Sequence, residues 1–133
     1  MAEIRGHILV VDDNKLNRMK LTHCLRQEGY SSDTAEDGRQ ALAMLRAQPF
    51  DLVLLDILMP EMDGYQVLRE MKADTVLGSI PVILISALEE SEGAAKGIEM
   101  GAADYLPKSF DPVLLKTRIG ACLEKKLLRD QEG

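Results

Sequence analysis

The chain has 133 residues, of which 22 are acidic and 16 are basic, so its formal charge is −6. This length suits one domain that buries about two thirds of its unfolded surface without a disulfide or a structural metal. The acidic balance disfavours direct binding to nucleic acid, and no stretch approaches the roughly 18 apolar residues of a membrane span. Because the first residues also lack a signal-peptide pattern, the sequence predicts a cytoplasmic protein without a membrane contact.

Short apolar runs predict five β-strands, and helical patterns separate them. The second strand is more polar than the others, which is typical of an edge strand. Four consecutive apolar residues in the third strand indicate burial on both faces. The predicted strands are residues 8–11, 30–35, 52–55, 82–85 and 104–106.

Capping and breaking residues predict five helices. One of the polar residues at positions 12–14 caps the first helix, which stops at Gly29. The other helices are predicted between Gly38 and Pro49, from Asp63, within Glu89 to Met100, and from Asp111-Pro112. Gly93 and Gly97 each cost about 1 kcal/mol relative to Ala inside a helix. We therefore expect the fourth helix to be mobile.

Five βα units without a hairpin signal predict a single alternating α/β domain. In such a fold the strands are parallel, the crossovers are right-handed, and helices cover both faces of the sheet. The carboxyl ends of the strands then share one edge, where ligands and reacting groups collect.

Polar residues follow three of the predicted strands at that edge. Asp12 and Asp13 follow the first strand, Asp56 the third and Ser86 the fourth. Neighbouring strands lie about 5 Å apart, so these side chains are expected to converge. Clustered buried carboxylates are unfavourable without a counter-charge, and their oxygen atoms suit Mg²⁺. Lys108, just after the fifth strand, adds a further positive charge.

These residues belong to motifs that follow one another in a fixed order. The motifs are Asp12-Asp13, Asp56 with Met59-Pro60 and Asp63-Gly64, Ser86-Ala87, and residues 101–108. Together they resemble the receiver domain of bacterial two-component response regulators, over about residues 7–120. The resemblance implies a flavodoxin-like (βα)5 fold with strand order 2-1-3-4-5 and a switch point between strands one and three.

The resemblance further implies that Asp56 is the phosphoacceptor of a phosphorelay. The phosphoryl group would come from the phosphohistidine of a sensor histidine kinase or a phosphotransfer protein. A carboxylate can attack phosphorus when the negative charges of both groups are screened. The implied Mg²⁺ ligands are Asp13, Asp56 and the backbone carbonyl of Leu58, with Asp12 acting mainly through water. Lys108 would pair with a phosphoryl oxygen.

A conformational switch is also implied by the resemblance. Ser86 and Ala87 would contact the phosphoryl group, and Tyr105 would turn inward into the space that Ser86 vacates. This change would reshape the surface of the fourth helix, fifth strand and fifth helix, and so control an output domain or a partner protein. The implied role is regulatory, with self-catalysed phosphotransfer and dephosphorylation as its chemistry.

One position departs from the family pattern. Lys108 is usually followed by a proline whose preceding peptide bond is cis, whereas Ser109 follows it here. A cis bond before a non-proline residue costs about 2.5–4 kcal/mol. Either the loop is trans and Lys108 is aimed differently, or the fold bears the strain.

Other interpretations stay open. Taken singly, Asp12 and Asp13 fit a helix cap, Asp56 fits a turn, and Tyr105 fits ordinary packing. A Mg²⁺-dependent aspartyl phosphatase of the haloacid dehalogenase type would need a second aspartate where Leu58 stands. A Rossmann nucleotide site would need glycines in place of Asp12-Asp13. A receiver-shaped scaffold that is never phosphorylated is the third alternative.

Residues 123–133 are predicted to extend the last helix beyond a receiver domain of residues 1–122. The extension resembles the helical linker that joins receivers to nucleotide cyclase, phosphatase or kinase output domains, which predicts the receiver part of a longer protein. A slightly long, frayed terminal helix is the alternative. Leu123 and Leu127 lie four residues apart and could pair two copies, so a homodimer also stays open.

Overall fold

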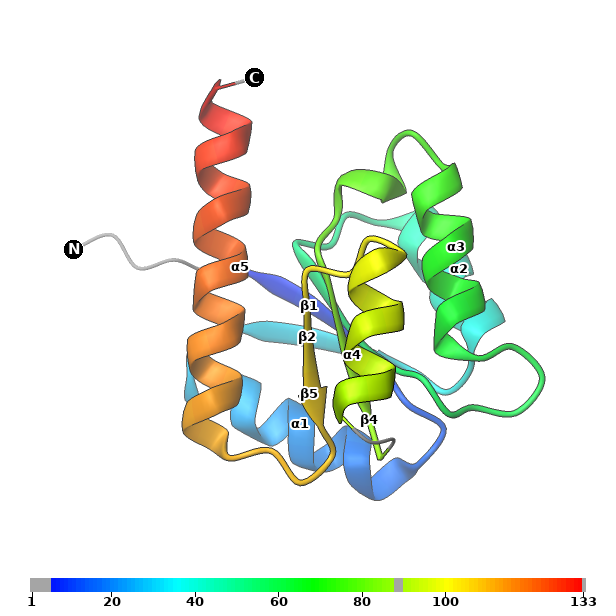
Figure 1. The fold of residues 1–133 in the computed structure, drawn as a ribbon. Coiled ribbons are helices and arrows are strands. Elements are labelled where there is room, and N and C mark those ends of the chain that lie inside the picture. Colours follow the sequence, from blue (N-terminus) through cyan, green and yellow to red (C-terminus); the bar gives the residue numbers. More distant parts are fainter. Residues whose placement is uncertain (1–5, 88–89, 133) are drawn as a thin grey trace.

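The computed structural model describes residues 6–87 and 90–132, which form a parallel five-stranded sheet between two layers of helices (Figure 1). The strand order is β2-β1-β3-β4-β5, and every neighbouring pair is parallel. This arrangement confirms the predicted flavodoxin-like (βα)5 fold. The strands are β1 (His7–Val11), β2 (Ser31–Ala35), β3 (Leu52–Asp56), β4 (Val82–Ser86) and β5 (Asp104–Pro107).

Five α-helices and one short 3-10 helix connect the strands. They are α1 (Lys15–Gln27), α2 (Gly38–Ala47), α3 (Gly64–Ala73), η1 (Leu77–Ser79), α4 (Glu90–Glu99) and α5 (Pro112–Glu132). Figure 1 shows α1 and α5 on one face of the sheet and α2, α3 and α4 on the other. Residue 89, within the range predicted for the fourth helix, lies outside the described residues, and the sequence did not predict η1.

The inner strands β1, β3 and β4 are buried on both faces, which explains their continuous apolar runs in the sequence. Leu9 and Val53 pack in the core under α2, α3 and α4, whereas Ile8 and Leu52 pack in the core under α1 and α5. Successive side chains of a strand point to opposite faces, so a strand covered on both sides needs apolar residues at every position. The polar residues of these inner strands therefore lie at the strand ends.

The helix caps decide which acidic residues are available at the carboxyl edge of the sheet. The cap of α1 is Asn14, whose side chain accepts a hydrogen bond from the N–H of Asn17 at 3.0 Å. Asp12 and Asp13 therefore do not cap the helix. The cap of α3 is Asp63, which forms a reciprocal capping box with Gln66. A left-handed Gly29, with φ +87°, ends the turn after α1 as predicted.

The glycines of α4 have a packing role. A Cβ atom added to Gly93 would lie 2.8 Å from the ring of Tyr105, and one added to Gly97 would overlap Leu84. The helix therefore lies so close to β4 and β5 that a side chain at either position would collide with the sheet. The expected mobility of this helix stays a prediction.

The last helix continues without a break past residue 122. Leu123 is buried, the carbonyl of Ser79 accepts a 2.6 Å hydrogen bond from Arg129, and Lys126 lies 3.8 Å from Asp51. Leu127 and Leu128 are about half exposed. Among the residues described here, no helix is both long enough and apolar enough to cross a membrane.

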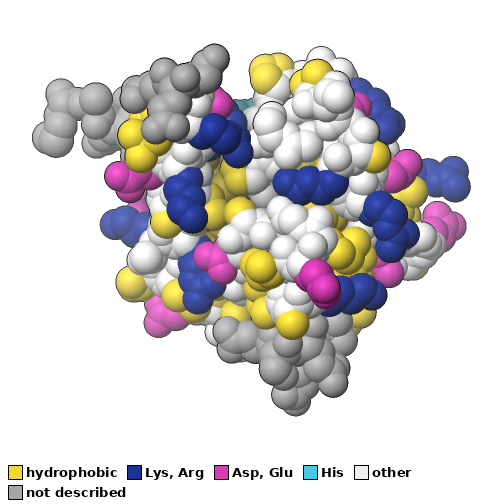
Figure 2. Space-filling view, turned by 45° about the horizontal axis from the view of Figure 1, so that its top comes forward, with side chains coloured by type: hydrophobic (Ala, Val, Ile, Leu, Met, Phe, Trp, Pro, Cys, Tyr) yellow, Lys and Arg dark blue, Asp and Glu magenta, His cyan; other side chains and the backbone are white. Residues whose placement is uncertain are grey.

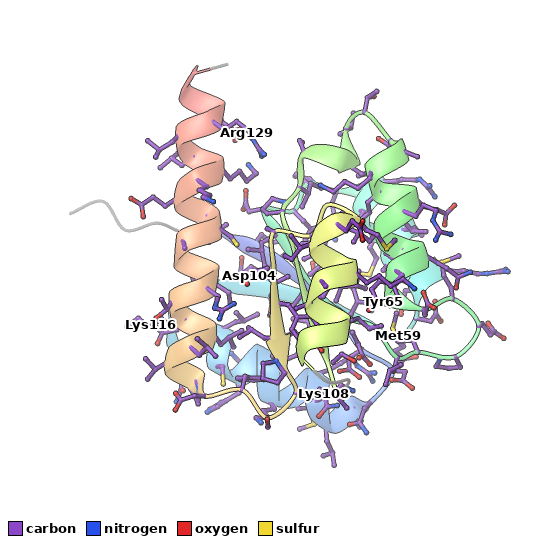
Figure 3. The ribbon with its side chains drawn as sticks, in the orientation of Figure 1. Met59, Tyr65, Asp104, Lys108, Lys116 and Arg129 are labelled. Carbon is purple, nitrogen blue, oxygen red and sulfur yellow. The ribbon has the colours of Figure 1, made fainter. Side chains whose placement is uncertain are left out.

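The end of the molecule that carries Arg129 lies opposite the end that carries Lys108 (Figure 3). Figure 2 shows Lys and Arg side chains spread over this side of the surface, with Asp and Glu side chains between them. Lys125, Lys126 and Arg129 of α5 line a cavity of about 190 Å³ together with Pro81 and Asp104.

Candidate functional site at the carboxyl edge of the sheet

Asp56 occupies the centre of the carboxyl edge because β3 is the middle strand and Asp56 is its last residue. Its side chain is only 1% exposed. The Oδ1 atom accepts a 3.3 Å hydrogen bond from the N–H of Leu58, which turns the chain away from the strand. Four preceding apolar residues anchor this carboxylate, since all of them are buried.

Asp12 and Asp13 lie beside Asp56 at the end of β1. The carboxylate of Asp12 is buried and accepts a 2.8 Å hydrogen bond from the N–H of Asn14, whereas Asp13 is exposed. One carboxylate oxygen from each of the three aspartates lies within 4.8 Å of the other two. The structure thus brings together the three acidic residues that the sequence singled out.

Lys108 reaches this acidic group from the loop after β5. Its Nζ atom lies 3.2 Å from Oδ2 of Asp56 and 3.7 Å from Oδ2 of Asp12. The backbone N–H of Lys108 donates to the carbonyl of Ser86 at 2.9 Å, which fixes the start of the loop. The ends of β4 and β5, which lie on the same side of β3, therefore together hold the ammonium group of Lys108 next to Asp56.

The peptide bond between Lys108 and Ser109 is trans, because the described residues contain no cis peptide bond. Phe110 is buried two residues after Lys108, and the Nζ atom of Lys20 lies 4.6 Å from the centre of its ring. The loop is thus trans, as in the first of the two alternatives. Lys108 is not redirected by this bond, because it still points at the acidic group.

Burial and the neighbouring Asp12 carboxylate raise the pKa of Asp56 from 3.8 to about 6, against the opposing effects of Lys108 and the Leu58 N–H. For Lys108, burial alone would lower the pKa, but the carboxylates of Asp56, Asp12 and Asp13 outweigh it and raise the pKa above 10.5. The lysine therefore stays protonated at neutral pH. One ammonium group does not fully compensate the negative charge of three aspartates.

The donor set fits a hard divalent cation. Two of the three carboxylates are buried, and one oxygen atom from each of the three lies within 4.8 Å of the other two. Mg²⁺ prefers such oxygen ligands. Leu58, whose backbone carbonyl is the fourth ligand implied by the resemblance, lies two residues after Asp56 in the turn and is about half exposed.

The three residues of the implied switch take different positions. Ser86 is fully buried at the end of β4, and Ala87 follows it on the exposed side. Tyr105 pairs in register with Leu84, two residues before Ser86, and its ring is buried beneath Gly93 of α4. Tyr105 thus lies under α4, with its aromatic ring already turned inward.

The sequence did not single out Arg18 as part of the site, but the structure places it there. A guanidinium N–H of Arg18 donates to the backbone carbonyl of Asp12 at 2.7 Å. The position of Arg18 on α1, four residues after the cap Asn14, points it back over the first turn toward β1. A basic residue one turn into the helix after an Asp-Asp pair is the signal that could have revealed it.

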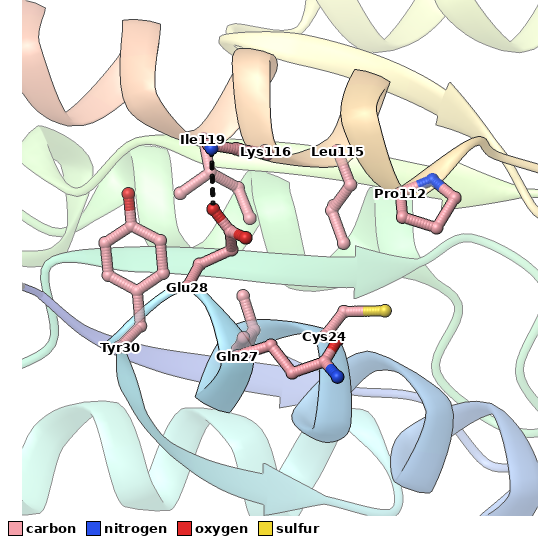
Figure 4. Close-up of a pocket in the computed structure, with 9 residues that line it drawn as sticks. Cys24, Gln27, Glu28, Tyr30, Pro112, Leu115, Lys116 and Ile119 are labelled. Carbon is pink, nitrogen blue, oxygen red and sulfur yellow. Dashed lines mark ion pairs between the residues drawn. The ribbon is translucent and has the colours of Figure 1, made fainter.

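A further pocket lies between α1 and α5, away from the acidic group (Figure 4). Its volume is about 30 Å³, which holds little more than a water molecule. Lys116 and Glu28 form an ion pair of 3.2 Å across its mouth. The pocket joins the two helices and has no group that suggests chemistry.

The fold and the acidic edge together define a domain of the flavodoxin-like class with a cluster of carboxylates at its switch point. The family described as the response regulator receiver domain matches residues 8–120, and the chain belongs to this family. It is 43% identical over 126 residues to response regulator PleD of Caulobacter vibrioides, covering 95% of this chain and 28% of that protein. It is 38% identical to the DNA-binding response regulator MtrA of Mycobacterium tuberculosis, covering 94% of this chain and 54% of that protein.

Solved structures agree with this assignment. A receiver domain of a signal transduction histidine kinase from Syntrophus aciditrophicus superposes with a TM-score of 0.83 at 35% identity, over 90% of this chain and 91% of that one. NtrX from Brucella abortus superposes with a TM-score of 0.88 at 32% identity, over 96% of this chain and 29% of that one. The chain thus spans between about a quarter and a half of the named regulators PleD, MtrA and NtrX.

Proposed function

We propose that the chain is the phosphoacceptor of a two-component phosphorelay and that Asp56 receives the phosphoryl group. The observation that carries this proposal is the position of Lys108, whose ammonium group lies 3.2 Å from a buried aspartate that two further carboxylates flank. A cation and a cluster of carboxylates around one buried carboxylate are what a phosphoryl acceptor requires, since transfer depends on positioning and charge stabilisation.

The proposed reaction joins an Oδ atom of Asp56 to phosphorus. The bond between phosphorus and the imidazole nitrogen of a phosphohistidine breaks, and its electron pair stays on the imidazole, which takes up a proton. A pKa of about 6 leaves Asp56 mostly ionised at neutral pH, so that it can act as the nucleophile. Lys108, which is protonated, pairs with a phosphoryl oxygen and compensates the charge that arrives.

Asp12, Asp13, Asp56 and the backbone carbonyl of Leu58 would hold Mg²⁺ at this site. When bound, Mg²⁺ would screen the negative charges of the carboxylate and the phosphoryl group. Asp13 is exposed and Asp12 is buried, so the exposed side of the site is open to both the ion and the donor. A sensor histidine kinase or a phosphotransfer protein is the proposed donor, in the cytoplasm.

Phosphorylation is proposed to act on the surface formed by α4, β5 and α5. Ser86 and Ala87 would contact the phosphoryl group, and the buried ring of Tyr105 would hold α4 through its contact at Gly93. The change would control an output domain or a partner protein, so the role is regulatory rather than that of a metabolic enzyme. The family and the burial of Ser86 and Tyr105 support this proposal.

Residues 123–133 are proposed to lead from the receiver domain, residues 1–122, toward an output domain. The short coverage of PleD and NtrX supports this proposal, because both matched proteins extend well beyond the matched part. The exposed Leu127 and Leu128 would serve a helical linker or a homodimer.

Substitution of Lys108 by methionine tests the proposed chemistry. Lys108→Met keeps the length of the side chain but removes its charge, and we expect phosphorylation by acetyl phosphate in Mg²⁺ to slow on the order of 100-fold. The rate is measured as the fraction of phosphorylated protein over time. Lys116→Met is the matched control, because Lys116 pairs with Glu28 at the far pocket of Figure 4. Equal rates for the two variants would exclude the proposed role of Lys108.

A further inference from the structure

Arg18 connects the acidic edge to the neighbouring loop after β2. Its Nη1 atom donates to the backbone carbonyl of Asp12 at 2.7 Å, and its Nη2 atom lies 3.4 Å from Oε1 of Glu36. The side chain of Arg18 is only 12% exposed, whereas that of Glu36 is 71% exposed. The short hydrogen bond to Asp12 is therefore better shielded from water than the ion pair with Glu36, which is a weak surface contact.

The contact with Arg18 completes the immobilisation of Asp12. The N–H of Asp12 donates to the carbonyl of Ala35 at 3.2 Å, and its carboxylate accepts from the N–H of Asn14 at 2.8 Å. The carbonyl that Arg18 holds belongs to the peptide bond between Asp12 and Asp13. Because a peptide unit is planar, holding this carbonyl also sets the direction in which the chain enters Asp13.

Arg18 opposes the tendency of the acidic residues to separate. Three carboxylates whose oxygen atoms lie within 4.8 Å of one another repel, and the exposed Asp13 is the least enclosed of the three. A hydrogen bond between a charged donor and the carbonyl next to Asp13 holds its backbone against that repulsion. Groups that orient metal ligands without touching the metal commonly matter for affinity.

We propose that Arg18 is a positioning residue for the Mg²⁺ site. It fixes the peptide unit that joins Asp12 to Asp13, so that both carboxylates face Asp56 before the ion arrives. The inference rests on the proposed function, because it assigns a role toward the Mg²⁺ that the phosphoacceptor would need. It also has a definite sign: a positioning effect makes Mg²⁺ bind more weakly when Arg18 is lost, whereas loss of its repulsive charge alone would make Mg²⁺ bind more tightly.

Isothermal titration of Mg²⁺ into the metal-free chain measures this effect. For Arg18→Gln we expect the dissociation constant to rise about 10-fold relative to the wild type. Arg26→Gln, which removes an exposed arginine from the far end of the same helix, should leave affinity unchanged. Glu36→Gln should change it less than about 2-fold, because the Arg18 bond to Asp12 remains.

A fold control and a second variant keep the result decisive. Circular dichroism reports whether Arg18→Gln is folded. If it is not, Arg18→Met decides, because it keeps the apolar part of the side chain but has no N–H to donate to the Asp12 carbonyl, and weaker Mg²⁺ binding is again expected. Unchanged or tighter binding in the folded variant, beside a wild type that binds Mg²⁺, overturns the role of Arg18 but leaves the proposed function intact. Failure of the wild type itself to bind Mg²⁺ overturns both.

Discussion

Replacement of Asp56 by asparagine is expected to raise the free energy of unfolding at pH 7, without Mg²⁺, by roughly 2–3 kcal/mol. In the wild type, burial and the Asp12 carboxylate disfavour the ionised form of Asp56 and raise its pKa from 3.8 to about 6. An asparagine side chain at this position would have nearly the same shape as the neutral aspartic acid but no charge to bury. The buried, ionised carboxylate of Asp56 is therefore expected to make the folded protein less stable, although it is the group that reacts.

The pH dependence of this gain has a definite direction. Because the pKa of Asp56 is higher in the folded state than in the unfolded state, the folded protein binds more protons between about pH 4 and pH 6. The folded state thus gains the full stabilisation from protonated Asp56 below about pH 4. It loses this stabilisation as the pH rises through 6 and Asp56 ionises. The wild type and Asp56→Asn should converge near pH 4 and differ fully at pH 7.

Urea denaturation at several pH values measures both effects. Asp130→Asn is a suitable control, because it makes the same substitution at an exposed position near the end of α5, and it should show no comparable gain at pH 7. Added Mg²⁺ should stabilise the wild type more than Asp56→Asn, since the ion compensates a charge that only the wild type carries. A variant at position 56 that is less stable than the wild type at pH 7 would contradict the account of a strained acidic cluster.

The second large effect is expected at Gly64. A Cβ atom added there would overlap the backbone oxygen of Asp56 and lie 2.8 Å from Cα of Ile57. Both are backbone atoms at the end of the central strand, so they cannot move without displacing the Asp56 carboxylate. We expect Gly64→Ala to destabilise the fold by about 2–3 kcal/mol and to slow phosphorylation by acetyl phosphate.

Gly120→Ala is the matched control for this substitution. Gly120 lies inside α5, and an added Cβ atom would meet no atom within 4 Å. Alanine favours a helix over glycine by about 1 kcal/mol, so this variant should be slightly more stable than the wild type. If the denaturation midpoints of both variants stay near that of the wild type, the close approach of α3 to Asp56 is not required for the stability of the fold.

The sequence predicts the order of the elements and the position of the acidic group because both follow from local patterns. Buried parallel strands leave continuous apolar runs, and a polar residue at the end of a run must lie at the sheet edge. Asp12 and Asp56 follow from this argument alone. The position of Lys108 next to them, with a trans bond to Ser109, is set by the three-dimensional path of the loop, which sequence periodicity does not specify.

Other features depend on contacts between distant parts of the chain. The bond of Arg18 to the Asp12 carbonyl and the tight fit of Gly93 over Tyr105 require knowledge of how closely α1 and α4 approach the sheet. The sequence predicts mobility in α4 from its glycines, and the structure adds a steric reason for their presence. The contact of Arg129 with Ser79, 50 residues apart, likewise has no local signal.

Intact mass after incubation with acetyl phosphate tests the central claim most directly. The wild type and Asp56→Asn are compared with and without Mg²⁺. The account predicts one phosphoryl-sized gain in mass that appears only in the wild type and only with Mg²⁺. The absence of a gain under every condition would contradict the account and favour a receiver-shaped scaffold that is never phosphorylated, and an equal gain in Asp56→Asn would assign the acceptor to another residue.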